Sequence, residues 1–315
     1  EILESDLSFS GTKNDFFIDL SFESYETMGL SNNNRYEFVY PNYSLYKNID
    51  LTNTFFESLD VSSYGNQRTH TTNIYEAVQV NDLLLSSKKF INRKGFENNF
   101  KALFKNVNSE GENSPKFKKD IQSEVLNIIS YDLSLPLKKS GELFFDYLTP
   151  KISLRHSPND TNNIKNNDHY LSKSNIFNLN RIGTNESIEG GSSITYGFEY
   201  ERQNLEFDKI FNFSAASVIR SQENENLPLK STLGQKQSDI VGNIYYSPIS
   251  NIDFNYDYSL NKNTETVNLH SLTNKIKANN FVHTFNFYEE NNIIGKNSYF
   301  SNKLKYMAND KSSFS

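Results

Sequence analysis

Histidines are the side chains in this sequence best suited to metal binding or proton transfer, and their spacing argues against both roles. The five histidines are scattered, and none shares an HxH, HxxxH or HExxH spacing that would place two ligands side by side. The chain has no cysteine, which excludes disulfides, thiolate metal sites and cysteine nucleophiles. We therefore expect no metal site and interpret the histidines as strand-face or loop residues: His70, His156, His169, His270 and His283.

Glycine and acidic residues form no recognisable catalytic motif either. The sequence has no G-x-S-x-G elbow, glycine-rich phosphate loop or Walker motif. The single glycine pair, Gly190-Gly191, precedes a predicted strand, which favours a turn or bulge over an anion site. The pair Glu289-Glu290 falls where a strand should end, so we interpret both as solvated loop charges. The sequence predicts no enzyme, no catalytic residue and no cofactor.

A second set of polar residues lies on one face of predicted strands. In a barrel that face lines the lumen, where such side chains either contact a polar cargo or simply hydrate a water-filled interior. Hydration is the simpler interpretation for any one of them. The lumen-facing candidates are Glu199, Glu201, Asp253, Asn255 and Asp257.

The elements that carry these residues have a period of two. In Ile252–Leu260 every even residue is apolar or aromatic and every odd residue is polar, as in a strand with one apolar face. The pattern recurs over 193–201, 207–219 and 239–247. Shorter apolar sets include Phe16/Ile18/Leu20/Phe22, Leu143/Phe145/Tyr147, Phe281/Phe285/Phe287 and Phe300/Leu304/Tyr306. We predict roughly fourteen strands of about ten residues, the length that spans a bilayer.

Two kinds of connection separate the predicted strands. Residues 203–206 and 247–251 are short and polar, whereas 106–119, 157–174 and 221–237 are long and rich in polar residues. Short turns at one end and long polar loops at the other are typical of outer-membrane barrels. Structureless loops longer than about 15 residues count against an ordinary compact domain.

One segment allows two interpretations. Phe117, Ile121, Val125 and Ile128 recur at helical spacing within 116–129, which is compatible with an amphipathic helix. We favour a strand over Glu124–Leu137, with a helical lead-in before it.

Composition fits a single β-rich domain over 1–315. Hydrophobic residues make up 36% and the mean hydropathy is −0.66, yet aromatics reach 14%, which disordered chains lack. No stretch approaches the roughly 18 apolar residues of a membrane-spanning helix. The net charge of −6 argues against nucleic acid as a partner. Glu1 is neither an initiator methionine nor the start of a signal peptide, so we expect an excised piece.

The stretch IFNLNRIGTNESIEGG at 176–191, followed by TYGFEY at 195–200, resembles the LptD family of lipopolysaccharide-assembly outer-membrane proteins. Residues 35–41, 148–158 and 238–248 are similar to other strands of the family, the last typical of alphaproteobacterial members. The motif residues, which we expect to be structural, are Asn180, Arg181, Glu189, Gly190, Gly191, Tyr196 and Gly197.

The resemblance implies part of a C-terminal transmembrane barrel in the outer membrane of a Gram-negative bacterium. Its cargo would be lipopolysaccharide placed in the outer leaflet, and its partners membrane lipid, an LptE-like lipoprotein plug and an LptA-like periplasmic bridge. The sequence departs from the family in lacking the N-terminal jelly-roll, the first barrel strands, a closing strand and the cysteines of many members. We therefore expect an incomplete barrel that could not transport alone.

Two other function classes remain open from the sequence. One is a different outer-membrane barrel acting as a pore or receptor. The other is a soluble, secreted β-rich surface protein.

Overall fold

A single antiparallel sheet dominates the computed structural model, which describes residues 1–30, 35–51, 54–71, 73–206, 208–292, 295–309 and 312–314. Among these residues, fifteen strands are nine residues or longer. They are β1 (Ile2–Lys13), β2 (Phe16–Thr27), β3 (Tyr36–Asp50), β4 (Phe56–His70), β5 (Ile74–Ser87), β7 (Glu97–Glu112), β8 (Gln122–Ser134), β10 (Phe144–Ser157), β11 (Gly191–Asn204), β12 (Lys209–Arg220), β13 (Ile240–Ile249), β14 (Ile252–Leu260), β15 (Val267–Ala278), β16 (Phe281–Asn292) and β17 (Gly295–Asn309). Three short strands are β6 (Phe90–Ile91), β9 (Leu137–Ser140) and β18 (Ser312–Phe314).

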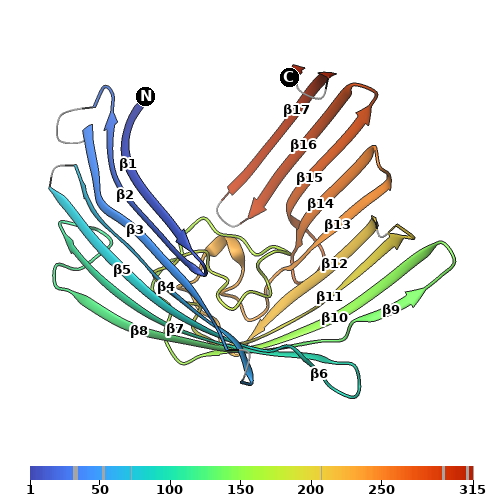
Figure 1. Cartoon of the computed structure of the whole chain (residues 1–315), viewed down its shortest axis with the longest axis horizontal. Helices are drawn as coiled ribbons and strands as arrows, with labels where there is room; N and C mark the ends of the chain where they lie inside the picture. The colour runs from blue at the N-terminus through green and yellow to red at the C-terminus, as the bar shows by residue number, and fades with distance from the viewer. Residues whose placement is uncertain are drawn as a thin grey trace.

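The long strands follow one another as a meander that curls into an open trough (Figure 1). β1 to β8 form one wall and β10 to β17 the other, and the two chain ends lie at opposite rims. In the described part of the chain, β1 pairs only with β2 and β18 only with β17, so the sheet does not close. The prediction of an all-β, antiparallel, partial barrel is confirmed. Within the described residues, no helix has the length and apolar character needed to cross a membrane.

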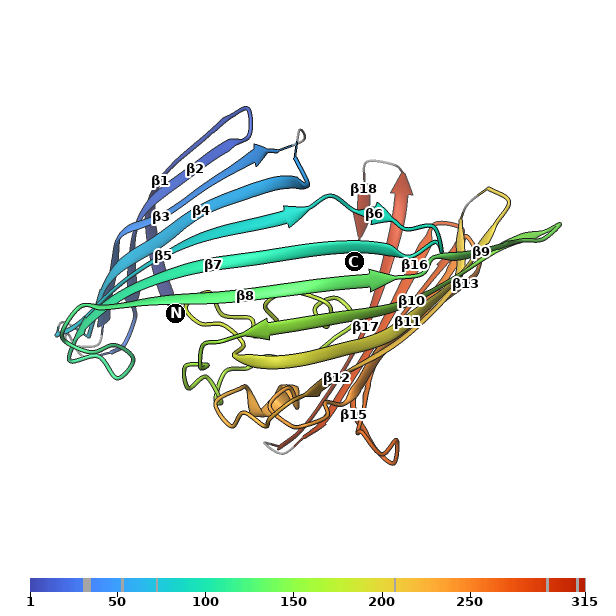
Figure 2. The same ribbon diagram turned by 90° about the horizontal axis from the view of Figure 1, so that it is seen from below.

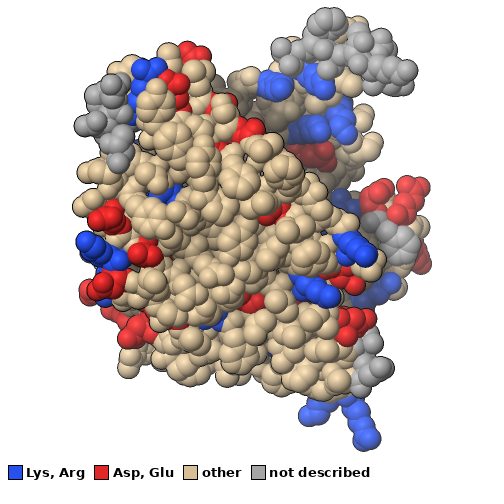
Figure 3. Space-filling view, turned by 60° about the vertical axis from the view of Figure 1, so that its left-hand side comes forward, with Lys and Arg blue, Asp and Glu red and all other residues tan. Residues whose placement is uncertain are grey.

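The two faces of the sheet follow the period-two pattern. β14 has the bounds predicted from the alternation, and its acidic residues lie on the concave, inner face, where Tyr245 donates to Asp253 and Asn243 donates to Asp257. Phe254 lies on the opposite, outer face beside its partner Tyr246, which is 47% exposed. Figure 3 shows the outer face of the β1–β8 wall, where uncharged residues cover most of the centre and most charged residues lie toward its margins.

Connections differ between the two ends of the trough. Residues 14–15, 141–143, 250–251 and 279–280 make short turns at one end, which we call the short-turn end. At the other, the long-loop end, 158–190 joins β10 to β11 and 221–239 joins β12 to β13. These two segments, the inner loops, fold back into the concave side of the trough (Figure 1; Figure 2 shows the floor strands from below). The second contains the 3-10 turn η1 (Leu229–Ser231).

The prediction of a long loop over 106–119 is wrong for the first half of that segment. β7 continues to Glu112, and only 113–121 lies outside strands. The polar residues that suggested a loop are held in a ladder of side chains: Asn81 donates to Asn106 at 3.3 Å and Asn108 donates to Asn106 at 2.7 Å. The first of these bonds joins β5 to β7, and cross-strand pairs of this kind stabilise a polar strand segment.

The ambiguous segment is a strand. β8 begins at Gln122, and the residues before it form bends rather than the helical lead-in that we expected. The strand is interrupted at residues 135–136 and resumes as β9. Pro136 explains the break, because proline has no amide hydrogen to donate to a ladder.

Two apolar clusters join the inner loops to the sheet. In one cluster, Ile188 packs against Val80, Leu126 and Ile128 of the strands. In the other, residues of both inner loops pack against β12 and β13: Leu171, Ile176, Ile182, Leu227 and Leu233 contact Ala216, Val218 and Val241. The inner face here is therefore a packed core, not the water-filled surface that simple alternation predicts.

Candidate functional site

The centre of the first inner loop is organised by Asn180. Its side-chain oxygen accepts a hydrogen bond from the Glu189 amide at 3.2 Å, and its amide donates to the Ser187 carbonyl at 3.2 Å. Side chains of asparagine often hold irregular backbone in this way, because they replace the partners that helix or sheet would supply. Asn180 thus fixes the segment that carries Arg181 opposite the segment that carries Glu189.

Arg181 and Glu189 form a buried, two-pronged ion pair. Arg181 donates from Nε to Glu189 Oε2 at 2.8 Å and from Nη2 to Oε1 at 2.5 Å. The same guanidinium donates to Thr195 Oγ1 at 2.6 Å and to Ser193 Oγ at 2.8 Å, both on β11. The planar fork of arginine matches a carboxylate in this geometry and fixes orientation as well as charge. The pair therefore attaches the loop to the inner face of the sheet.

Two further arginines approach the same carboxylate from neighbouring strands. Arg220 of β12 donates from Nη1 to Glu189 Oε1 at 2.5 Å and from Nη2 to the Gly190 carbonyl at 2.5 Å. Arg155 of β10 has its Nη1 3.3 Å from Glu189 Oε1 and donates from Nε to the Leu179 carbonyl at 2.7 Å. We call these four residues, Arg155, Arg181, Glu189 and Arg220, the arginine–glutamate centre.

Charge in this centre is fixed rather than titratable near neutral pH. All four side chains are 0–4% exposed. Burial alone raises the pKa of the Glu189 carboxyl, but the three guanidinium groups outweigh burial and hold that pKa at about 2. Three arginines facing one glutamate leave excess positive charge, which the carbonyl groups of Leu179, Glu189 and Gly190 partly offset. Such a centre is suited to holding a loop, not to transferring protons.

Glycines of the motif permit close packing around the centre. A Cβ on Gly190 would lie 2.2 Å from the Asn159 carbonyl oxygen, and the Gly190 amide donates to Thr161 Oγ1 at 2.8 Å. Gly191 has φ +83°, in the region that favours glycine. A Cβ on Gly197 would lie 2.5 Å from the Ala216 Cβ. Gly190 and Gly197 therefore allow close approaches that alanine would obstruct, whereas Gly191 permits a backbone conformation that favours glycine.

Comparison with known families identifies the chain. The model of the LptD family, LPS transport system D, matches residues 101–309, which is more than half of the 315 residues. The chain belongs to the LptD family. The resemblance inferred from 176–200 is confirmed, and the matched segment contains the complete arginine–glutamate centre. No curated protein matches the chain. The LptD family belongs to lipopolysaccharide transport at the outer membrane.

The predicted motif residues of this LptD family chain divide between the two faces. Tyr196 lies on the outer face and is 38% exposed. The six others lie at or beneath the inner loops. The motif is therefore a unit of packing and charge pairing around the loop, and Tyr196 stands apart from it.

The lumen-facing candidates all lie on the inner face, and each has a partner. Glu199 accepts from Lys151 and from Lys173, which belongs to the first inner loop, both at 3.1 Å. Glu201 lies 2.7 Å from Lys209. Asp257 accepts from both Asn243 and Asn255 at 2.9 Å, whereas Asp253 accepts from Tyr245 at 3.1 Å. Glu199 therefore helps to hold a loop, while the acidic residues of β14 form part of the wall.

The sequence did not indicate Arg220, the contacts of Arg155, or the pairing of Glu290 with Lys230. Glu290 lies within β16 and is 3% exposed, so its interpretation as a solvated loop charge is wrong. Lys230 of the second inner loop lies 3.7 Å from Glu290 and 2.6 Å from Asp168 of the first. This cation therefore joins both inner loops to β16, further along the wall from which the loops arise. Among the described residues, no group of three His, Asp or Glu side chains has metal-binding geometry.

Proposed function

We propose that this LptD family chain forms part of the wall of an outer-membrane translocon that inserts lipopolysaccharide into the outer leaflet. Its outer face would contact membrane lipid and its inner face the polar part of the cargo. The observation that carries the proposal is the family match over 101–309, which covers β7 in part, β8 to β17 and both inner loops.

The exposed side chains of the outer face support a membrane location. Ile152, Leu154 and Ile194 lie on adjacent strands of that face and are 43–46% exposed. Soluble proteins rarely expose apolar surface over a whole face, because it promotes association. A sheet with an apolar outer face and polar inner side chains suits lipid on one side and water on the other. This favours a membrane wall over the soluble, secreted alternative.

The inner loops favour transport through a controlled passage and count against a passive pore. Three arginines and the Lys230 pairs tie these loops to β10, β11, β12 and β16, so a fixed structure occupies the concave side. We extend the family resemblance to an LptE-like lipoprotein plug beside the inner face and to an LptA-like periplasmic bridge that delivers the cargo.

Photocrosslinking from the inner face tests the proposal in living cells. A photoreactive phenylalanine would replace Asn255 or Thr273, both half-buried on the inner face. We expect an adduct with lipopolysaccharide at both positions, and we expect it to disappear when cellular energy is removed. Ser193, buried against Arg181, is the control and should give no adduct. Absence of adducts at Asn255 and Thr273 would favour a pore that never carries lipopolysaccharide.

A further inference from the structure

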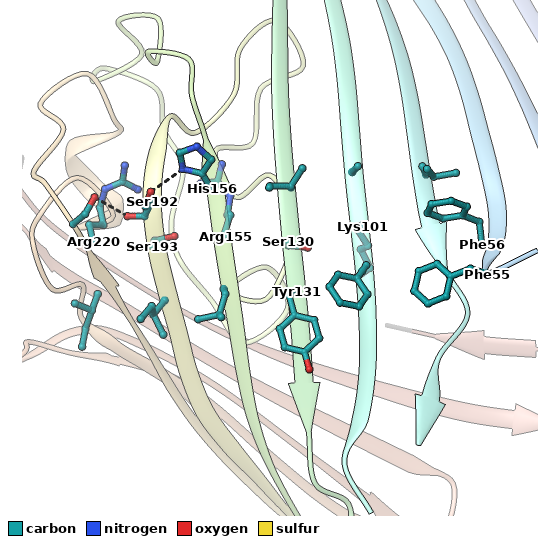
Figure 4. Close-up of a pocket in the computed structure, with 18 residues that line it drawn as sticks. Phe55, Phe56, Lys101, Ser130, Tyr131, Arg155, His156, Ser192, Ser193 and Arg220 are labelled. Atoms are coloured by element: carbon teal, nitrogen blue, oxygen red, sulfur yellow. Dashed lines mark hydrogen bonds between the residues drawn. The ribbon is translucent and has the colours of Figure 1, made fainter. Parts of the chain in front are cut away.

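A groove of about 880 Å³ lies across β5 to β12 on the outer face (Figure 4). Residues that line the groove alternate along their strands with residues of the arginine–glutamate centre: Leu154 precedes Arg155, and Ile219 precedes Arg220. Because successive strand residues point to opposite faces, the arginines turn to the inner loops and the aliphatic residues turn outward. The volume lies within the range of about 300–1,000 Å³ that is usual for small-molecule sites.

The groove is apolar over most of its length. Leu154, Ile194 and Ile219, from three adjacent strands, form one side and are 43–46% exposed. Aromatic rings form the other side, with Phe100 4.6 Å from Tyr131 and 6.0 Å from Phe55 between ring centroids. Ala102 lies two residues beyond Phe100 on β7, is paired with Ile129 of β8, and supplies only a methyl group to the groove.

One end of the groove is polar. His156, Ser192 and Ser221 each lie two residues beyond an aliphatic residue of the row, so they share the outer face and lie nearer the long-loop end. His156 Nδ1 lies 2.8 Å from Ser192 Oγ, and Ser221 Oγ donates to the Ser192 carbonyl at 3.3 Å. Figure 4 shows His156 and Ser192 on the flank opposite Phe55 and Phe56. The polar end coincides with the strand ends, where a membrane head group would lie.

We propose that this groove binds one lipid of the leaflet at the long-loop end, its acyl chain in the apolar part and its phosphate at the polar end. A lipid matches both parts, because it is the amphipathic molecule that the outer face of a membrane wall meets. An imidazole and two hydroxyls supply donors for phosphate oxygens. The proposal rests on the membrane location proposed above and assigns a fixed lipid to one place on the wall.

Tryptophan fluorescence tests the proposal, because the sequence contains no tryptophan. The full-length protein carrying Phe100→Trp would be reconstituted in vesicles with increasing fractions of brominated phosphatidic acid, and its signal corrected with the unsubstituted protein. Phe22→Trp, on the outer face of β2 and 36% exposed at that position, is the matched reporter outside the groove. We expect stronger quenching of the Phe100→Trp reporter at low fractions of brominated lipid.

Two further sets of variants test whether the quenching depends on the apolar part of the groove and on its polar end. Adding Ala102→Phe should abolish the excess quenching, whereas Ala77→Phe, on the outer face of β5 away from the groove, should leave it unchanged. Combining His156→Ala with Ser192→Ala should remove the preference for brominated phosphatidic acid over brominated phosphatidylcholine.

Two failures are distinguishable. Equal quenching of both reporters at every lipid fraction would overturn the lipid site and leave the membrane location intact. Absence of quenching at both reporters would overturn the membrane location itself.

Discussion

At the scale of the residue, Glu189 is the side chain on which the inner loop most depends. It is fully buried, and it is the carboxylate that Arg155, Arg181 and Arg220 share. Removing one partner of a buried charge pair is costly because the remaining charges stay buried without compensation. Without the Glu189 carboxylate, the three arginines would remain buried with uncompensated positive charge.

Glu189→Gln should therefore destabilise the protein by about 3–5 kcal/mol, the usual cost of breaking a buried pair. Glu186→Gln is the matched control, since Glu186 pairs with Lys116 at a partly exposed position and should cost less than about 1 kcal/mol. Denaturant unfolding in detergent, with proteolysis of the 158–190 loop as a local readout, measures both. Equal stability of the two variants would show that the centre does not hold the loop.

The pH dependence of this difference provides a second readout of the same prediction. Because the folded pKa of Glu189 is lowered from 4.5 to about 2, its stabilising contribution is complete above the unfolded value and disappears as the pH falls through the folded value. The stability gap between the unsubstituted protein and Glu189→Gln should stay constant above about pH 5 and shrink toward pH 2. A gap that persists unchanged at pH 2 would mean that charge is not its cause.

At the scale of the element, the two faces of β14 predict which single substitutions the strand tolerates. Phe254→Arg should cost about 2–4 kcal/mol if Phe254 lies near the bilayer midplane, because the charge would face lipid. Asp253→Asn should be nearly neutral, since an amide oxygen can still accept from Tyr245. Asp257 is a poorer control than Asp253, because both of its oxygens accept from amide donors. Folding into lipid vesicles measures each change, and equal tolerance at Phe254 and Asp253 would refute the two faces.

Strands were predictable wherever apolar and polar residues alternate along the chain. In β14 each side chain is assigned to a face by its position, so the bounds and the faces both follow from Ile252–Leu260. The rule failed at Asn106 and Asn108, because a cross-strand bond from Asn81 to Asn106 and a bond from Asn108 to Asn106 within β7 let these polar residues remain in a strand.

The arginine–glutamate centre was only partly predictable. Arg181 and Glu189 lie in one recognisable stretch, but Arg155 and Arg220 lie 34 and 31 residues from Glu189. Only the pairing of β10, β11 and β12 brings them together. A local motif contains no information about such partners. The one available signal was that Arg220 is the last residue of β12 and Arg155 lies two residues before the end of β10, each next to a long polar segment.

At the scale of the whole molecule, the sheet, its inner loops and its apolar outer face fit the proposal that this LptD family chain forms part of the wall of a lipopolysaccharide translocon. The inner loops are tied by charge pairs to strands from β10 to β16, through Glu189 and Lys230.

The proposed function is tested most directly by depleting the full-length protein in its own cells and measuring newly made lipopolysaccharide at the cell surface. We predict that surface lipopolysaccharide falls as the protein is depleted, while its synthesis continues and other outer-membrane barrels remain in place. Re-expression of the unsubstituted protein should restore it. Unchanged arrival of lipopolysaccharide at the surface after complete depletion would contradict the proposed function.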